Sequence, residues 1–140
     1  MAMLFLSKKG SALIGTSGEL PLTFDLNDQE VYRTCGVTFQ NKQFIFGGAS
    51  RRDQILQVVD CGLVRIGSTP FYHELSACGS TDDAIMLCFN GDPNADESEY
   101  KRCRQAVSPS GPWSELELST FTHKGASIAI SPGKITVSTA

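Results

Sequence analysis

TCGVTFQNKQFIFGG, from Thr34 to Gly48, decides the fold, because a similar stretch follows it one period later. The second copy is ACGSTDDAIMLCFNG, from Ala77 to Gly91. Three landmarks indicate a single register, with intervals of 43, 43 and 42 residues, namely Cys35 to Cys78, Phe46 to Phe89 and Cys61 to Cys103. A fixed period of this length predicts a repeat architecture.

A third, partial copy begins near residue 119. STFTHKGASIAISPGKITV resembles STPFYHELSACGSTDDAIML, which lies 50 residues earlier in the chain. The additional residues fall in DPNADESE and SPSGPW. Both stretches are polar and contain Pro or Gly, as expected of loops that tolerate insertions.

Short apolar segments alternate with Asn, Gly and Asp turns inside the first period. Val, Ile, Phe and Leu favour half-buried strands, and they dominate residues 35–39, 43–46, 55–61 and 63–66. No long stretch has an apolar period of 3.6 residues, so we expect almost no helix. Four strands in one period of about 43 residues are typical of a propeller blade. The sequence therefore predicts an all-β fold of four-stranded antiparallel blades.

These residues resemble the kelch-repeat β-propeller family over residues 32–140. A kelch repeat runs an apolar strand into a double glycine, here Gly47 and Gly48 after FIF, and later ends a strand at an acidic residue, here Asp60. Leu63 or Val64 stands where the family places a Trp.

The second copy departs further from the kelch pattern. Asn90 and Gly91 replace the glycine pair, Tyr100 is assigned to the third strand, and Trp113 opens the fourth. The resemblance implies a kelch-type β-propeller fragment in which Gly47, Gly48, Tyr100 and Trp113 are structural.

The repeats divide the chain into an N-terminal segment and two and a half blades. Residues 1–31 are assigned to the last strand of a preceding blade, and the repeats to about 32–75, 76–120 and, in part, 121–140. A propeller needs about four to eight blades. We therefore expect the missing blades to come from a longer chain or from self-association.

The charge of the chain argues against two classes of partner. With 12 basic and 15 acidic residues the net charge is -3, which offers no electrostatic footprint for nucleic acid or an anionic membrane. No apolar run is long enough to predict a membrane span. The opening MAMLFLSKKG lacks the order of a secretory signal, and the five cysteines leave the compartment open.

No set of residues predicts catalysis, a metal site or a cofactor. Asp92, Asn94 and Asp96 are spaced like the opening of a calcium loop, but Glu97 and Cys103 stand where a glycine and a bidentate glutamate are required. The equivalent positions of His73 and His123 indicate loop or inter-blade packing. We expect a protein that is not an enzyme.

The kelch resemblance implies a scaffold that binds protein partners through the loops between its strands. Arg51, Arg52 and Asp53 follow the first glycine pair, and residues 92–99, with Asp92, Asp96 and Glu97, follow the second. These loops are equivalent and carry opposite charge. We expect them on one face, as the partner-contact surface.

The cysteines keep two alternatives open. Cys35 and Cys78 are expected to be reduced and packed on the first strands of successive blades, where kelch proteins commonly bury a small residue. Cys88 and Cys103 would be cross-strand neighbours and the pair most suited to a disulfide in an oxidising compartment. A disulfide-stabilised extracellular module is therefore one alternative function. A propeller enzyme such as an oxidase or glycosidase is the other.

Overall fold

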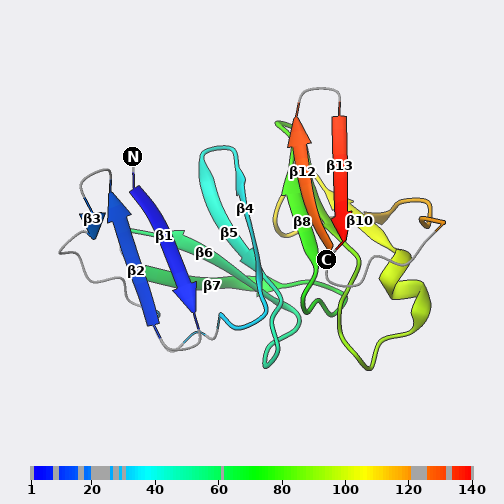
Figure 1. The fold of residues 1–140 in the computed structure, drawn as a ribbon, viewed down its shortest axis with the longest axis horizontal. Coiled ribbons are helices and arrows are strands. Elements are labelled where there is room, and N and C mark those ends of the chain that lie inside the picture. The colour runs from blue at the N-terminus through cyan, green and yellow to red at the C-terminus, as the bar shows by residue number, and fades with distance from the viewer. Residues whose placement is uncertain are drawn as a thin grey trace.

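The chain folds into antiparallel β-sheets with almost no helix, as predicted (Figure 1). The computed structural model describes the backbone of residues 2–7, 10–15, 18–19, 26, 29, 31–60, 62–120, 126–131 and 134–139. Side chains are described for residues 26, 29, 31–60 and 62–120.

The first four-stranded sheet occupies the first predicted period. Its strands are β4 (Cys35–Phe39), β5 (Lys42–Phe46), β6 (Gln54–Val59) and β7 (Gly62–Ser68), and they lie side by side in chain order. Gln40 and Asn41 join β4 to β5 with φ values of 49° and 62°. Positive φ at both turn residues suits the right-handed twist of the two strands, so this turn favours the hairpin.

The second sheet repeats this order. It contains β8 (Ala77–Ser80), β9 (Ile85–Cys88), β10 (Cys103–Ala106) and β11 (Trp113–Glu115). Trp113 opens the fourth strand, as predicted. The assignment of Tyr100 to the third strand is wrong, because Tyr100 lies in the 3-10 helix η1 (Glu97–Lys101), where its hydroxyl donates a 3.0 Å hydrogen bond to the carbonyl of Asp92.

One landmark of the predicted register fails. Cys103 begins β10, which is the third strand of its sheet, whereas the third strand of the first sheet begins at Gln54 and ends at Val59. The third strands therefore begin 49 residues apart, so the interval from Cys61 to Cys103 does not relate equivalent positions. The additional length lies in the loop of residues 89–102, which includes η1, while residues 47–53 form the shorter equivalent.

Backbone hydrogen bonds identify which residue replaces the first glycine of the pair. The NH of Gly47 donates to Gln54 at 3.0 Å, and the NH of Phe89 donates to Arg102 at 2.8 Å, in each case just after the second strand. Both residues have positive φ, 69° at Gly47 and 57° at Phe89. Phe89 thus takes the backbone position of Gly47 one repeat later.

Two smaller sheets flank the pair. Residues 1–31 contain β1 (Ala2–Ser7), β2 (Gly10–Gly15) and β3 (Gly18–Glu19), which form a three-stranded sheet. Near the C-terminus, β12 (Ala126–Ser131) and β13 (Lys134–Thr139) form a hairpin. The first strands of the repeats follow one another in space, because β4 lies beside β8 and β8 lies beside β12 (Figure 1).

Both four-stranded sheets are apolar on two faces. Phe44 and Phe46 of the first sheet join Ile85 and Leu87 of the second in one buried cluster between the sheets. On the other face of the first sheet, Ile45 packs with residues that also include Val31, Leu56 and Leu63. On the other face of the second, the cluster contains Ala77, Met86, Cys88 and Phe89. Side chains alternate along a strand, so each sheet must be covered from both sides.

The four cysteines that the structure describes form two disulfides. Cys88 and Cys103 are paired residues on β9 and β10, and their sulfurs are joined at 2.03 Å. Cys35 and Cys78 were expected to be reduced, and that expectation is wrong, because a disulfide joins them. They lie on β4 and β8, the neighbouring first strands of the two sheets, so this bond crosses the sheet interface. Cys61 lies outside the described residues.

Gly47 is required where the first sheet meets the connection to the second. Its φ is 69°, and a Cβ added there would overlap the carbonyl of His73. We expect Gly47→Ala to lower the free energy of unfolding by about 2–4 kcal/mol, from the left-handed backbone and the overlap together. Gly36→Ala is the matched control, since its Cβ would have only an ordinary 3.7 Å contact with Phe44.

Chemical denaturation of the two variants measures this difference. Equal stability of Gly47→Ala and Gly36→Ala would contradict the close approach of the connection to Gly47.

Candidate partner-binding site on the loop face

The two ends of the sheets differ in the length of their connections. At one end, short turns at residues 40–41 and 81–84 join the first and second strands of each sheet. At the opposite end lie the loops of residues 47–53 and 89–102 and the connection between the sheets, residues 69–76. These three segments are called the loop face below. The expectation that residues 51–53 and 92–99 share a face agrees with the contacts between them.

Backbone hydrogen bonds attach the connection 69–76 to the first sheet. Thr69 and His73 donate NH bonds of 2.7 Å to Asp53 and Arg52, and His73 in turn accepts a 2.9 Å bond from Gly48. On the other side, the NH of Gly91 donates to Glu74 at 2.7 Å. The connection is therefore held between the two loops.

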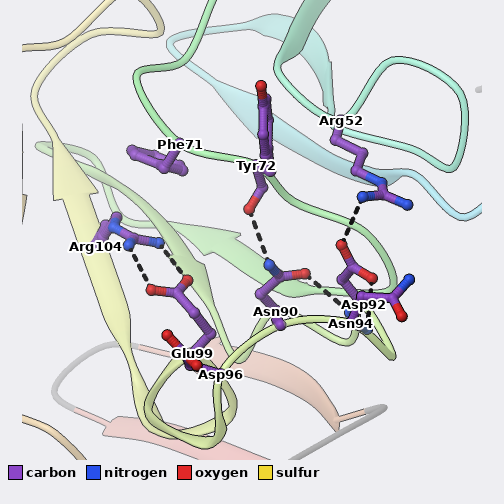
Figure 2. Close-up of a pocket in the computed structure, with 10 residues that line it drawn as sticks. Arg52, Phe71, Tyr72, Asn90, Asp92, Asn94, Asp96, Glu99 and Arg104 are labelled. Carbon is purple, nitrogen blue, oxygen red and sulfur yellow. Dashed lines mark hydrogen bonds and ion pairs between the residues drawn. The ribbon is translucent and has the colours of Figure 1, made fainter.

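Ion pairs reinforce this arrangement. Glu74, whose side chain is 3% exposed, accepts from Arg33 at 2.7 Å and lies 3.4 Å from Nε of Arg52. Nη1 of Arg52 also reaches Oδ2 of Asp92 at 2.9 Å (Figure 2). A buried carboxylate is stable only when its charge is paired. Arg52 thus links a loop of the first sheet to the connection and to a loop of the second.

Asn90 fixes the backbone around these charges. Its Oδ1 accepts from the NH groups of Glu74 at 3.1 Å and Asp92 at 3.0 Å, and its Nδ2 donates to the carbonyl of Tyr72 at 3.1 Å. The side chain is buried, so these bonds satisfy a polar group that would otherwise be costly to bury. Asn90 therefore positions the exposed Tyr72 relative to Asp92.

A cavity of about 400 Å³ opens on the loop face. Figure 2 shows the Arg52–Asp92 pair on one side and Arg104 with Glu99 on the other. Two parallel bonds of 3.0 and 3.1 Å join Arg104 to Glu99, and its guanidinium lies 4.3 Å above the ring of Phe71. A bidentate, stacked arginine is rigid, so this wall of the cavity is preorganised.

Of the remaining predicted contact residues, Arg51, Asp53, Asp96 and Glu97, only Asp96 lines this cavity. Glu97 is exposed outside it and pairs with Lys101 at 3.8 Å. Arg51 is exposed and donates a 3.4 Å hydrogen bond to Gln29. Asp53 lies 3.7 Å from Arg65. Arg52 and Asp92 thus join segments of the chain to one another.

Both carboxylate oxygens of Asp92 are already occupied by groups of the chain itself. Oδ1 of Asp92 accepts from the backbone NH of Asn94 at 2.9 Å, and Oδ2 pairs with Arg52. Within the side chains that the structure describes, no group of three or more His, Cys, Asp or Glu residues could hold a metal ion. His73 is buried in the connection between the sheets, and His123 lies outside the described residues.

Sequence reasoning missed three buried polar residues at the loop face. Asn90 and Arg104 line the cavity, and Glu74 pairs with Arg52, which also lines it. Glu74 follows His73, and Asn90 belongs to the dipeptide that replaces the glycine pair, but neither position predicts a buried polar side chain. Arg104 is the one of the three that the sequence could have indicated. It lies within an expected strand, and an arginine at a buried strand position is rare unless its charge is paired.

Comparisons with known proteins do not assign a family. No protein-family model matches the chain, and no curated protein matches it significantly. Among the described residues, no helix has the length and apolarity needed to cross a membrane.

His73 is a buried imidazole on the loop face. Its Nδ1 lies 2.5 Å from the hydroxyl of Ser76, and no described group hydrogen-bonds to its Nε2. Burial, with the nearby positive charge of Arg104 as a second cause, lowers the pKa of His73 to about 3 from 6.5. The folded protein therefore holds His73 neutral.

This depressed pKa predicts acid sensitivity. Between about pH 6.5 and 3 the unfolded chain binds a proton at His73 that the folded chain excludes, so stability falls as the pH falls, by up to about 1.4 kcal/mol per unit. We expect His73→Gln to flatten the stability curve between about pH 6.5 and 5. Denaturation at several pH values measures the difference in slope, and identical slopes would contradict the neutral buried imidazole.

The adjacent arginines provide a second test. Arg52→Ala removes the partner of two buried carboxylates, Glu74 and Asp92, although Arg33 still pairs with Glu74. We expect a loss of about 2 kcal/mol in the free energy of unfolding, below the usual cost of breaking a buried pair because Arg52 is partly exposed.

The control is Arg51→Ala, which removes the same charge one residue earlier. We expect a change below about 0.5 kcal/mol, because Arg51 is exposed. Denaturant titration compares the two variants. If Arg51→Ala cost as much as Arg52→Ala, the ion pairs of Arg52 would not be what joins the loops.

Proposed function

We propose that this protein is a non-enzymatic, kelch-like propeller scaffold that binds a protein partner on its loop face. The observation that carries the proposal is the convergence of three segments, residues 47–53, 69–76 and 89–102, around one open cavity whose charged walls are held by buried ion pairs. Recognition surfaces are commonly loops positioned by a rigid scaffold.

The two-sided burial of the sheets supports the propeller part of the proposal. A sheet that is apolar on both faces needs a neighbour on each side, and the first strands β4, β8 and β12 already follow one another in space. Blades arranged around a ring satisfy that requirement. Packing then occupies both faces of the strands, so contacts with a partner fall on the loops.

The chemistry of the cavity supports a polar, charged partner surface. Paired carboxylates and guanidiniums alternate around it, and Tyr72 stands beside them with 62% of its surface exposed. Aromatic residues and arginines are enriched at protein interfaces, and fixed charges select partners by complementarity.

A disulfide-stabilised extracellular structural module is the second candidate. The pairing of Cys35 with Cys78 and of Cys88 with Cys103 favours it, because disulfides persist in oxidising compartments. The two candidates differ in whether the loop face has a specific partner.

Site-specific photo-cross-linking tests the proposal. We would place p-benzoylphenylalanine at position 72 on the loop face, or at exposed position 82 in the short turn at the opposite end, in the full-length protein in its native cells. We expect discrete adducts of one protein, identified by mass spectrometry, from position 72 and not from position 82.

Two further measurements test whether a cross-linked protein is a specific partner. The purified partner should bind the unlabelled protein with a defined stoichiometry, and Tyr72→Ala should weaken that binding without changing the melting temperature. Equal labelling from both positions, or no adduct from position 72, would overturn the loop-face assignment and favour the structural module.

A further inference from the structure

We propose that the Cys35–Cys78 disulfide is a redox-sensitive cross-link that regulates the loop face, and that a dithiol opens it without unfolding the sheets. Opening it loosens the junction between the two four-stranded sheets and weakens the binding of a partner there. This inference rests on the proposed function, because it names how that surface is regulated.

The disulfide lies at the loop-face end of the junction. Cys35 is the first residue of β4, and Cys78 is the second residue of β8, which directly follows the connection 69–76. β4 and β8 are the edge strands of two separate sheets, so the ladder of neither sheet extends across the junction. The disulfide therefore supplies a covalent bond between two strands that no ladder joins.

Other contacts hold the junction without the disulfide. The buried cluster between the sheets contains side chains from both of them. The NH of Leu75 donates to the carbonyl of Arg33 at 3.0 Å, and that of Gly48 donates to His73 at 2.9 Å. These contacts keep the sheets together after reduction. A disulfide limits how far its two strands separate when a region opens locally, so its loss makes such opening more frequent.

The loop-face cavity spans the same junction. Arg52 belongs to a loop of the first sheet, whereas Glu99 and Arg104 belong to η1 and β10 on the side of the second. The spacing of the cavity walls therefore depends on how the two sheets lie relative to each other. A preorganised surface binds more tightly than one that must be ordered on binding, so a looser junction weakens the binding of a partner.

The exposure of the two cysteines sets the direction of the reduction. Cys35 is buried, with 9% of its surface exposed, whereas Cys78 is partly exposed. A thiolate of the dithiol therefore attacks Sγ of Cys78, and the electron pair of the broken S–S bond leaves on Sγ of Cys35. The second thiolate then attacks the reductant sulfur of the mixed disulfide and releases Cys78. The dithiol ends as a cyclic disulfide, and its protons end on the two protein thiols.

The other disulfide offers a matched control. Cys88 and Cys103 lie on β9 and β10, which are already paired within one sheet. Beside them, the NH of Phe89 donates to the carbonyl of Arg102 at 2.8 Å. Loss of this disulfide therefore acts within the second sheet and leaves the junction between the sheets unchanged.

Amide hydrogen exchange on the full chain tests the role of the junction disulfide. The variant carries Cys35→Ala together with Cys78→Ala. We expect the amides of Leu75 and Gly48, which bond across the junction, to exchange at least about tenfold faster than in the oxidised protein, while that of Phe89 is unchanged. Failure of this variant to fold would overturn the proposal, because a switch needs two folded states.

The control variant carries Cys88→Ala together with Cys103→Ala. Here we expect faster exchange at Phe89 and unchanged exchange at Leu75. If both double variants accelerated Leu75 equally, the Cys35–Cys78 disulfide would have no special role at the junction, and the proposal would be wrong.

Reduction of the wild-type protein tests whether the disulfide opens in the folded state. Dithiothreitol titration would be followed by alkylation and peptide mapping. We expect Cys35 and Cys78 to be alkylated while the amides of β5 and β6 remain protected from exchange. Alkylation of this pair only when those amides lose protection would overturn the proposal, because the disulfide would then open only through unfolding.

The partner identified by cross-linking at position 72 separates this inference from the proposed function. We expect it to bind the Cys35→Ala, Cys78→Ala variant at least about threefold more weakly than the oxidised protein. Equal binding would leave the scaffold proposal standing and show that the redox regulation is wrong. If no partner is found while Leu75 and Gly48 exchange faster in the variant, the redox-sensitive junction stands and the protein-partner proposal is wrong.

Discussion

Burial of both faces of each four-stranded sheet is the constraint on which the rest of the structure depends. Phe44 and Ile45 are adjacent residues that point to opposite faces, and both are buried. A sheet of this kind cannot leave one face to water, as many antiparallel sheets do. Each sheet therefore needs a neighbour on both faces, and the chain passes from the first sheet to the second by a connection that lies at their ends.

That connection determines where charge can be placed. Residues 69–76 run between two loops, so the carboxylate of Glu74 is buried there and needs guanidinium partners, which Arg33 and Arg52 supply. The guanidinium of Arg52 also pairs with Asp92, in the loop of the second sheet. Structural pairing thus uses most of the charge on the loop face.

The all-β class and the positions of most strands in the two four-stranded sheets were predictable, because Val, Ile, Phe and Leu mark strands locally. The kelch resemblance predicted that Trp113 opens the fourth strand, and the repeat register predicted that Cys88 and Cys103 are cross-strand neighbours. The place of Tyr100 was not predictable, because the lengthened loop folds into a short helix whose signal is no stronger than that of a strand. The sequence also could not show that the loops meet through Glu74 and Asn90, since that depends on how two sheets stack.

The burial of Asn90 has a consequence for the chemical lifetime of the protein. Gly91 follows it, and an asparagine before glycine cyclises and deamidates readily, because the glycine leaves the attacking backbone nitrogen unhindered. In the folded chain three hydrogen bonds hold the Asn90 amide in place, so attack on its side-chain carbonyl requires the loop to open. A carboxylate formed there would stand beside Glu74 and Asp92 and repel both. The folded loop face therefore slows deamidation of Asn90, and deamidation occurs in molecules in which this loop has opened.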